Sequence, residues 1–234
     1  MEIVFNNDTL HIKNNKIYAL ISNDSYNKEK LFLNLSKKNI YPKNIKLSYI
    51  KKDNTLINKN INIIKYIYKK VKIKDINIIV DILCYLRFNK EILTKQLNEL
   101  NNYYLKLIEI AITIINNNNV IILDEPFYKI NGYEENNLIQ ILTSLKRNYN
   151  ITFIILTKNT NIIYKFIDYF FIINHGNIEL EGKRENLSKI TKNMNVNKPE
   201  ICEFIEIIRK KHDKDFRFFS DVRDLVKEIY RYIR

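Results

Sequence analysis

The sequence predicts an α/β protein with a mainly parallel sheet, an inserted helical subdomain and a small helical domain at its C-terminal end. Two short apolar runs, Val120–Leu123 and Ile151–Leu156, are bounded by turn-forming residues, as expected for strands buried on both faces of a parallel sheet. Segments with helical spacing of apolar residues follow such runs along the chain. The length of 234 residues is sufficient for one good-sized core with a small appendage.

The first half of the chain is expected to contain three strands, one helix and then a helical insertion. The strands are predicted at Leu10–Ile12, Lys16–Ile21 and Ile45–Ile50, and the helix begins near Lys28 and carries Leu31, Leu33 and Leu35. Between Asn60 and Leu97 the apolar residues recur at helical spacing, which predicts the inserted region.

The second half is expected to alternate helices and strands before it ends in two helices. A loop at Leu100–Tyr104 precedes a helix over Leu105–Ile115, and later helices are predicted at Glu134–Lys146 and Asn161–Phe166. Around Gly176, Tyr169–Asn174 and Asn177–Leu180 form a hairpin pattern. The last helices are predicted at Glu200–Lys211 and Ser220–Arg234, with Ser220 as an N-cap. We expect a main domain at 1–187, with the insertion at about 55–105, and a helical domain at 188–234.

The composition is that of a folded protein, with 46% hydrophobic and 28% charged residues. The net charge of +13 suits nucleic acid or an anionic membrane surface, but the lysines are scattered and the residue usage is typical of an AT-rich gene. Two distant cysteines indicate a reducing compartment. We see no signal peptide pattern and no apolar run near the ~18 residues that a membrane span needs. These features predict a protein that is soluble, or peripheral to a membrane through partners.

Two adjacent carboxylates, Asp124 and Glu125, follow the apolar run that begins at Val120. In open α/β sheets, ligands bind at the carboxyl ends of the strands, so these acids are candidate functional residues. Taken alone, such a pair is more often made of ordinary loop acids. However, the chain also has a strand, a polar loop and a helix led by Lys28, which is the skeleton of a P-loop nucleotide site.

In this order of features the sequence resembles the ATP-binding-cassette (ABC) ATPases, and its tail is most similar to energy-coupling-factor transporter ATPases. "VIILDEP" at Val120–Pro126 resembles an intact Walker B motif, and "IDYFFIINHGNIELEGKRENL" at Ile167–Leu187 the closing hairpin of the cassette. "ALISNDSYNKEKLFLNL" at Ala19–Leu35 falls at the Walker A position, and "LNNYY" at Leu100–Tyr104 at the signature loop. "ITFIILTKN" at Ile151–Asn159 occupies the switch strand, and "KPEICEFIEIIRKK" at Lys198–Lys211 resembles the dimer-forming tail.

The resemblance implies a role for each matching position. Glu125 would polarise the attacking water, Lys158 stands at the switch-histidine position, and Asp124 would help to hold Mg²⁺. The D-loop position is Asn131 and the Q-loop position is Lys51. The nucleotide would be bound by Ser22, Ser25, Asn27, Lys28, Glu29, Lys30 and Lys51. The signature loop would be Leu100, Asn101, Asn102, Tyr103 and Tyr104. ATP with Mg²⁺ is the implied ligand. The implied partners are a second ABC ATPase and a transmembrane component, at the cytoplasmic face of the cell membrane.

The departures from the family pattern bear on catalysis. Ser22, Ser25 and Asn27 replace the Walker A glycines, which provide positive φ and close approach to phosphate, and Glu29 replaces the Mg²⁺-binding hydroxyl. Tyr103 places a ring where the signature backbone should touch phosphate.

Three functions therefore stand as hypotheses: a divergent ATP-binding transporter subunit with weak or lost hydrolysis, an inactive structural or regulatory transporter partner, and a basic nucleic-acid-associated ABC-like ATPase. The late start leaves Phe5 as the nearest candidate for an adenine-stacking aromatic. A short Lys28–Lys51 segment suggests a lost hairpin.

Overall fold

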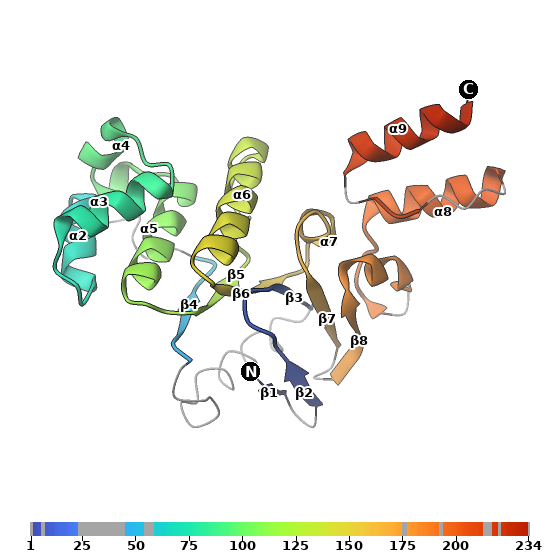
Figure 1. Ribbon diagram of the computed structural model, residues 1–234, viewed down its shortest axis with the longest axis horizontal. Helices are drawn as coiled ribbons and strands as arrows, with labels where there is room; N and C mark the ends of the chain where they lie inside the picture. Colours follow the sequence, from blue (N-terminus) through green and yellow to red (C-terminus); the bar gives the residue numbers. More distant parts are fainter. Residues whose placement is uncertain are drawn as a thin grey trace. The chain divides into compact units, whose positions relative to one another are not determined.

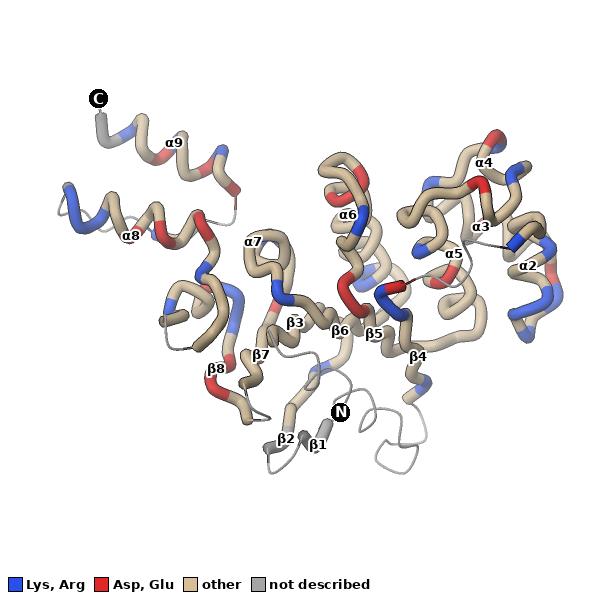
Figure 2. The backbone as a smooth tube through the Cα atoms, turned by 180° about the vertical axis from the view of Figure 1, so that it is seen from behind, with Lys and Arg blue, Asp and Glu red and all other residues tan. Residues whose placement is uncertain are grey.

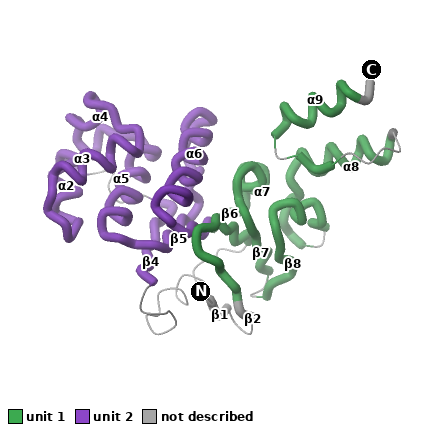
Figure 3. The backbone as a smooth tube through the Cα atoms, viewed as in Figure 1, with its two compact units in different colours: residues 1–40, 156–234 green, residues 41–155 purple. Residues whose placement is uncertain are grey.

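A computed structural model describes residues 2–5, 8–22, 45–53, 59–174, 177–191, 194–212, 217–219 and 221–233. The chain divides into two compact units, one of residues 1–40 and 156–234 and one of residues 41–155 (Figure 3). We describe each unit by itself. The predicted boundary between residues 187 and 188 remains a prediction.

The unit of residues 41–155 carries parallel strands and the helical insertion (Figure 1). Its strands are β4 (Leu47–Ile50), β5 (Val120–Asp124) and the greater part of β6 (Thr152–Thr157), in the order β4-β5-β6. Strands β4 and β5 are parallel, with Leu47 opposite Val120 and Ile50 opposite Leu123. Residues 120–123 are all buried, which confirms the prediction of a strand covered on both faces.

The helices of this unit begin at side-chain caps. They are α2 (Ile63–Lys70), α3 (Ile76–Tyr85), α4 (Lys90–Thr94), a 3₁₀ turn η2 (Leu97–Glu99), α5 (Asn102–Ile115) and α6 (Gly132–Asn148). The N-cap side chains of the five α-helices accept backbone N–H groups, and the capping residues are Asn62, Asp75, Asn89, Asn101 and Asn131. The abundant asparagines of this sequence therefore set where its helices start.

One prediction in this region is wrong. Residues 102–104 belong to the first turn of α5 and not to a loop, because the Asn101 side chain accepts the backbone N–H of Tyr104 at 3.2 Å and starts the helix there. At the other end of α5, Asn117 has a φ of 57°, which asparagine tolerates and which turns the chain towards β5.

The unit of residues 1–40 and 156–234 contains the end of β6 together with β3 (Ile17–Ile21), β7 (Tyr169–Asn174) and β8 (Asn177–Lys183), in the order β6-β3-β7-β8. Strand β3 is fully buried and parallel to β7, whereas β7 and β8 are antiparallel, as the predicted hairpin requires. A separate antiparallel pair is formed by β1 (Glu2–Phe5) and β2 (Asp8–His11). Gly176, the Lys28 helix, Ser220 and the proposed hairpin loss lie outside the described residues.

The helices of this unit are short or C-terminal. Helix α7 (Thr160–Ile163) ends earlier than predicted, because i→i+3 bonds from Lys165 and Phe166 close the chain into turns. A 3₁₀ segment η3 (Arg184–Lys189) follows β8. The predicted tail helices are α8 (Glu200–His212) and α9 (Val222–Ile233). A small core of Ile205, Phe219 and Leu225 joins them.

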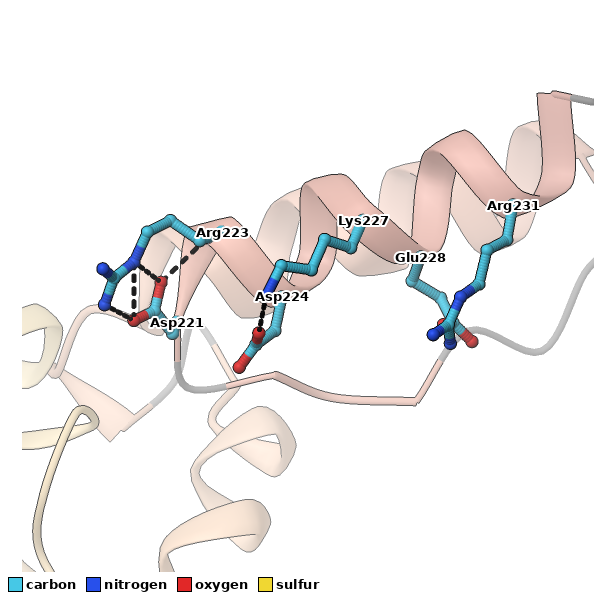
Figure 4. Close-up of polar contacts among 6 residues, drawn as sticks. All are labelled: Asp221, Arg223, Asp224, Lys227, Glu228 and Arg231. Carbon is cyan, nitrogen blue, oxygen red and sulfur yellow. Dashed lines mark hydrogen bonds and ion pairs between the residues drawn. The ribbon is translucent and has the colours of Figure 1, made fainter.

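Helix α9 carries charged side chains along one line and exposed apolar side chains along another. Lys227 pairs with Asp224 at 3.3 Å and Arg231 pairs with Glu228 at 3.1 Å, both one helical turn apart (Figure 4). The large apolar side chains exposed on α9 are Val222, Val226 and Tyr230, spaced four residues apart. No described helix of the protein is long and apolar enough to cross a bilayer.

Candidate functional site

The site is organised by Asp124 and Glu125, which end β5 and begin the turn after it. Strand pairing places Tyr49 of β4 opposite Ile122, and the Tyr49 hydroxyl donates to Asp124 Oδ2 at 3.3 Å. The predicted metal ligand is therefore already held by a neighbouring strand. This tyrosine was not among the predicted site residues, since only the strand register reveals the contact.

Glu125 has an unusual backbone. Its φ is 40°, in the left-handed region that non-glycine side chains rarely adopt, and such geometry is costly unless the surroundings hold it. The Glu125 carbonyl accepts the backbone N–H of Tyr128 at 3.0 Å and Lys106 Nζ at 3.4 Å. The turn after β5 is thus held by a side chain that belongs to α5.

Lys106 is the main feature of the site that sequence reasoning missed. Its side chain is only 2% exposed, and its ammonium also donates to the Lys52 carbonyl at 3.5 Å. Lys106 thereby connects the chain after β4 to the chain after β5. Burial lowers the pKa of Lys106, and four carboxylates oppose this effect through their charge, those of Glu109, Asp124, Asp53 and Glu125. The centre of the site is a buried cation among acids.

Glu109 lies one turn after Lys106 on the same helix. Burial raises the pKa of Glu109 to about 7, although the positive charges of Lys106 and Lys59 act to lower it. Among the described residues, the buried oxygen Oε2 of Glu109 has no hydrogen-bond partner. Loss of the positive charge of Lys106 would therefore destabilise the charged form of the Glu109 carboxylate.

The chain that leaves β4 covers the turn after Walker B. Lys51, at the Q-loop position, is exposed, whereas Lys52 is partly buried. The Lys52 ammonium lies 4.1 Å from the centroid of the Tyr128 ring, a cation–π distance. The Lys52 carbonyl accepts the ammonium of Lys106, which also binds the Glu125 carbonyl, and the Lys52 side chain contacts Tyr128. Both contacts therefore connect Lys52 to the turn after β5.

The signature positions are engaged within the chain. Asn101 caps α5 and also donates its Nδ2 to Glu134 Oε1 at 2.6 Å. Glu134 forms a capping box with Asn131, the D-loop position, at the start of α6. Two predicted positions are therefore joined through one carboxylate.

The aromatic residues that follow do not face an open site. Tyr103 is buried and its ring centroid lies 5.1 Å from that of Tyr104, which in turn packs edge-on against Phe88 at 5.2 Å. Burial also raises the pKa of Tyr103 to about 12. Leu100 is buried and Asn102 is partly buried, so most of the loop positions have structural neighbours.

The remaining predicted residues belong to the other unit or lie outside the described residues. Ser22 follows β3 and is buried, and Lys158 follows β6 and is exposed. Next to Lys158, Asn159 caps α7 and donates its backbone N–H to Thr157 Oγ1 at 3.1 Å. Ser25, Asn27, Lys28, Glu29 and Lys30 fall in the part of the chain that is not described.

The acids fit a magnesium ion by type, and Mg²⁺ usually takes only one or two carboxylates from a protein. Carboxylate oxygens are the ligands that Mg²⁺ prefers, and Asp124 is partly exposed at a strand end. The described residues contain no group of three or more His, Cys, Asp or Glu that could hold a metal. Asp124 also accepts the Tyr49 hydroxyl, and its charge acts on Lys106. The described part of the chain does not form a metal site by itself.

The architecture matches known nucleotide-binding domains. The structure of cbiO1 from Clostridium perfringens, part of the ABC transporter complex cbiONQ, superimposes with a TM-score of 0.69 over 88% of both chains at 17% identity. An ATP-binding cassette of an ABC transporter, MJ1267 in its ADP conformation, gives 0.65 over 80% of this chain and 90% of that one at 16% identity. The chain has the fold of an ATP-binding cassette.

The homologues of the cassette are ATP-binding proteins of ABC transporters. The energy-coupling factor transporter ATP-binding protein EcfA2 of Clostridium perfringens is 25% identical over 109 residues, which are 45% of this chain and 38% of that protein. A branched-chain amino acid transport ATP-binding protein, LivG, of Archaeoglobus fulgidus is 25% identical over 99 residues, 42% of this chain and 35% of that protein. The match thus spans less than half the length of these relatives. No family model matches the sequence.

Proposed function

We propose that this cassette is a divergent ATP-binding subunit of an ABC transporter of the energy-coupling-factor type, in which hydrolysis is weak or lost. The fold and the homologous ATP-binding proteins support the first part. The buried ammonium of Lys106 beside Asp124 and Glu125 carries the second part. It supplies a fixed positive charge at the acids that would otherwise face a metal ion and a water molecule.

The other motif positions support the same conclusion. Phosphoryl transfer depends on positioning and charge stabilisation, so several groups must act together. Removing one stabilising donor of an active site typically costs about 10²–10³ in rate. Here the Asn101 side chain is bound to Glu134 within the chain, and Ser25, Asn27 and Glu29 replace Walker A residues. When bound, Mg²⁺ would neutralise phosphate charge, and Asp124 is the described residue best placed to hold it.

Pairing with a second ATPase subunit and docking on a membrane component complete the proposal. The exposed apolar line of α9, with Tyr230 at 65% exposure, supports a pairing role for the tail. A cassette that pairs with an ATPase in the cytoplasm and docks on a membrane component would lie at the inner face of the cell membrane.

ATP turnover tests the proposal directly. We expect purified protein alone to show little or no turnover. In a mixture with an ATPase that has intact motifs, we expect turnover that Glu125→Gln in this chain does not reduce. Robust turnover abolished by Glu125→Gln would contradict the loss of hydrolysis. Nucleotide binding is measured separately as a rise in melting temperature with millimolar MgATP, since a ligand that binds only the folded state stabilises it. Absence of any rise would contradict the ATP-binding role.

A second candidate is a structural or regulatory transporter partner that does not use nucleotide. The burial of Tyr103 and the hydrogen bond between Asn101 and Glu134 favour it, because both signature positions already have partners within the chain. In this case Lys28→Ala would leave transport in cells intact, whereas changes in the helical insertion or on α9 would abolish it. Loss of transport in Lys28→Ala would exclude this candidate.

A further inference from the structure

One segment of the helical insertion concentrates positive charge. Six lysines occur between positions 59 and 74, and no aspartate or glutamate occurs there, namely Lys59, Lys65, Lys69, Lys70, Lys72 and Lys74. The whole chain has 39 basic residues among 234 and 26 acidic ones, so the local density of positive charge is well above that of the chain. General over-use of lysine does not explain a stretch without any acid.

The fold turns these lysines outwards. Helix α2 buries Ile63 and Ile67 against the core, whereas Lys65, Lys69 and Lys70 are exposed. The turn to α3 exposes Lys72 and Lys74 as well. Figure 2 shows the basic residues gathered along α2. We call residues 65–78 the basic edge.

Large apolar side chains are exposed among these charges. Ile76, at the start of α3, is 55% exposed, and the other exposed members are Tyr68, Ile73 and Ile78. Together with the lysines they form a surface that is both cationic and apolar. Large apolar side chains are not required at a helix end that faces only water. A group of exposed apolar residues with polar residues around it marks an interaction site.

The basic edge is preformed by hydrogen bonds from its own unit. Asn116 Oδ1 accepts the backbone N–H of Lys72 at 2.9 Å, and Asn116 Nδ2 donates to the Lys70 carbonyl at 3.4 Å. Asp75, the one acid of the basic edge, caps α3 through the backbone N–H of Asn77. The turn that carries the exposed residues is therefore fixed to the end of α5.

Tyrosines hold several of the ammonium groups close to the surface. Lys59 and Lys70 lie over the Tyr66 ring, at 5.0 and 5.9 Å from its centroid. Lys74 lies 5.1 Å from the Tyr68 centroid and also donates to the Tyr68 carbonyl. Tyrosine and lysine together are typical of side chains that meet the interface between water and lipid headgroups.

We propose that the basic edge binds the anionic surface of a lipid bilayer directly. Lysines near such a surface are attracted to anionic headgroups, and Ile73 and Ile76 are placed to enter the headgroup layer. A nucleic acid would use the charges but not the exposed isoleucines, and the basic edge contains no arginine for bidentate phosphate contacts. Binding to a bilayer through the basic edge does not require nucleotide, so it can be tested separately from the proposed function.

Vesicle co-sedimentation of the full chain, without nucleotide, tests the proposal. We expect binding to phosphatidylcholine vesicles that contain phosphatidylglycerol, little binding to phosphatidylcholine alone, and a decline with rising salt. Each lysine near an anionic surface contributes about 1 kcal/mol, so each neutralised lysine is expected to lower the partition coefficient roughly fivefold. The test variant replaces Lys69, Lys70, Lys72 and Lys74 with glutamine, and a second variant is Ile73→Ser with Ile76→Ser.

The matched control removes the same charge from exposed lysines of the other unit, at Lys13, Lys189, Lys210 and Lys211. The proposal requires the control to bind vesicles far better than the test variant, with unchanged melting temperatures in both. Equal losses in test and control would show that only net charge matters and would overturn it. Retained binding by the Ile73→Ser/Ile76→Ser variant, or tighter binding to duplex DNA than to anionic vesicles at equal salt, would overturn it as well.

Discussion

The buried pair on α5 gives the sharpest prediction about this molecule. Lys106→Met keeps most of the length of the side chain but removes its charge. The two hydrogen bonds of the ammonium, at 3.4 and 3.5 Å, are long, and we assign them at most about 1 kcal/mol each. A further loss comes from the partly buried carboxylate of Glu109, which keeps the charge of Lys59 but loses that of Lys106.

The cost depends on pH because Glu109 can accept a proton. With a pKa of about 7, Glu109 is mostly charged at pH 8 and mostly neutral at pH 6. Protonation of Glu109 limits its share of the cost at pH 8 to about 1.4 kcal/mol, the value of one pH unit above its pKa. We therefore expect Lys106→Met to lower the free energy of unfolding by at most about 3 kcal/mol at pH 8, hydrogen bonds included, and by about 1 kcal/mol less at pH 6. A chain of this size loses about 2–4 °C in melting temperature per kcal/mol.

A double-mutant cycle with Glu109→Leu isolates the pair. Replacing both partners with apolar side chains removes the two charges together, so the double variant should be at least as stable as Lys106→Met, with a coupling energy of about 1 kcal/mol at pH 8. Melting followed by circular dichroism provides the measurement, and Lys65→Met on the exposed side of α2 is the control, with a change within about 0.5 kcal/mol. Additive effects, or equal losses at both pH values, would refute the reasoning.

Three further predictions follow from single groups. Glu109 has an ordinary pKa of 4.5 and a folded pKa of about 7, so between these values the folded state binds a proton that the unfolded state does not. Stability should therefore fall as the pH rises through this window, and Glu109→Gln should flatten the slope seen in urea titrations at several pH values. Asn101→Ala removes the cap of α5 and should cost about 0.5–2 kcal/mol in thermal melts, whereas Asn101→Ser should recover a large part of the loss. Burial raises the pKa of the Cys202 thiol to about 11, whereas Cys84 is exposed, so a thiol reagent should label Cys84 in the native protein and reach Cys202 only after unfolding.

The strands were predictable because their signals are local. Four apolar residues between Asn119 and Asp124 specify a buried strand without any knowledge of its neighbours. Asparagine caps are also local signals, but asparagine is so frequent in this chain that its presence alone does not identify the residue that starts a helix. The first turn of α5 was missed for this reason, since Asn101 and Asn102 look alike in sequence and only one of them caps.

The sequence predicts a candidate site at the end of β5, but it does not predict which groups the acids of that site contact. Lys106 and Glu109 stand three residues apart in an otherwise apolar helix, which is a detectable signal for a buried pair. What they contact depends on the ends of β4 and β5, where the carbonyls of Lys52 and Glu125 converge on the ammonium. Tyr49 likewise reaches Asp124 only because the register of the strands places it there.

Lys106 gives a second reason for the presence of Asp124 and Glu125 after β5. Burial disfavours the charged ammonium, and the charges of Asp124 and Glu125 are among those that favour it. A chain that gave up hydrolysis would still lose stability if it replaced these acids, because the lysine would then be left with fewer compensating charges. Retention of the motif at Val120–Pro126 therefore does not require that Glu125 activates water. The same positive charge reduces the attraction of these acids for a metal ion, so the proposed weak hydrolysis is compatible with the presence of both acids.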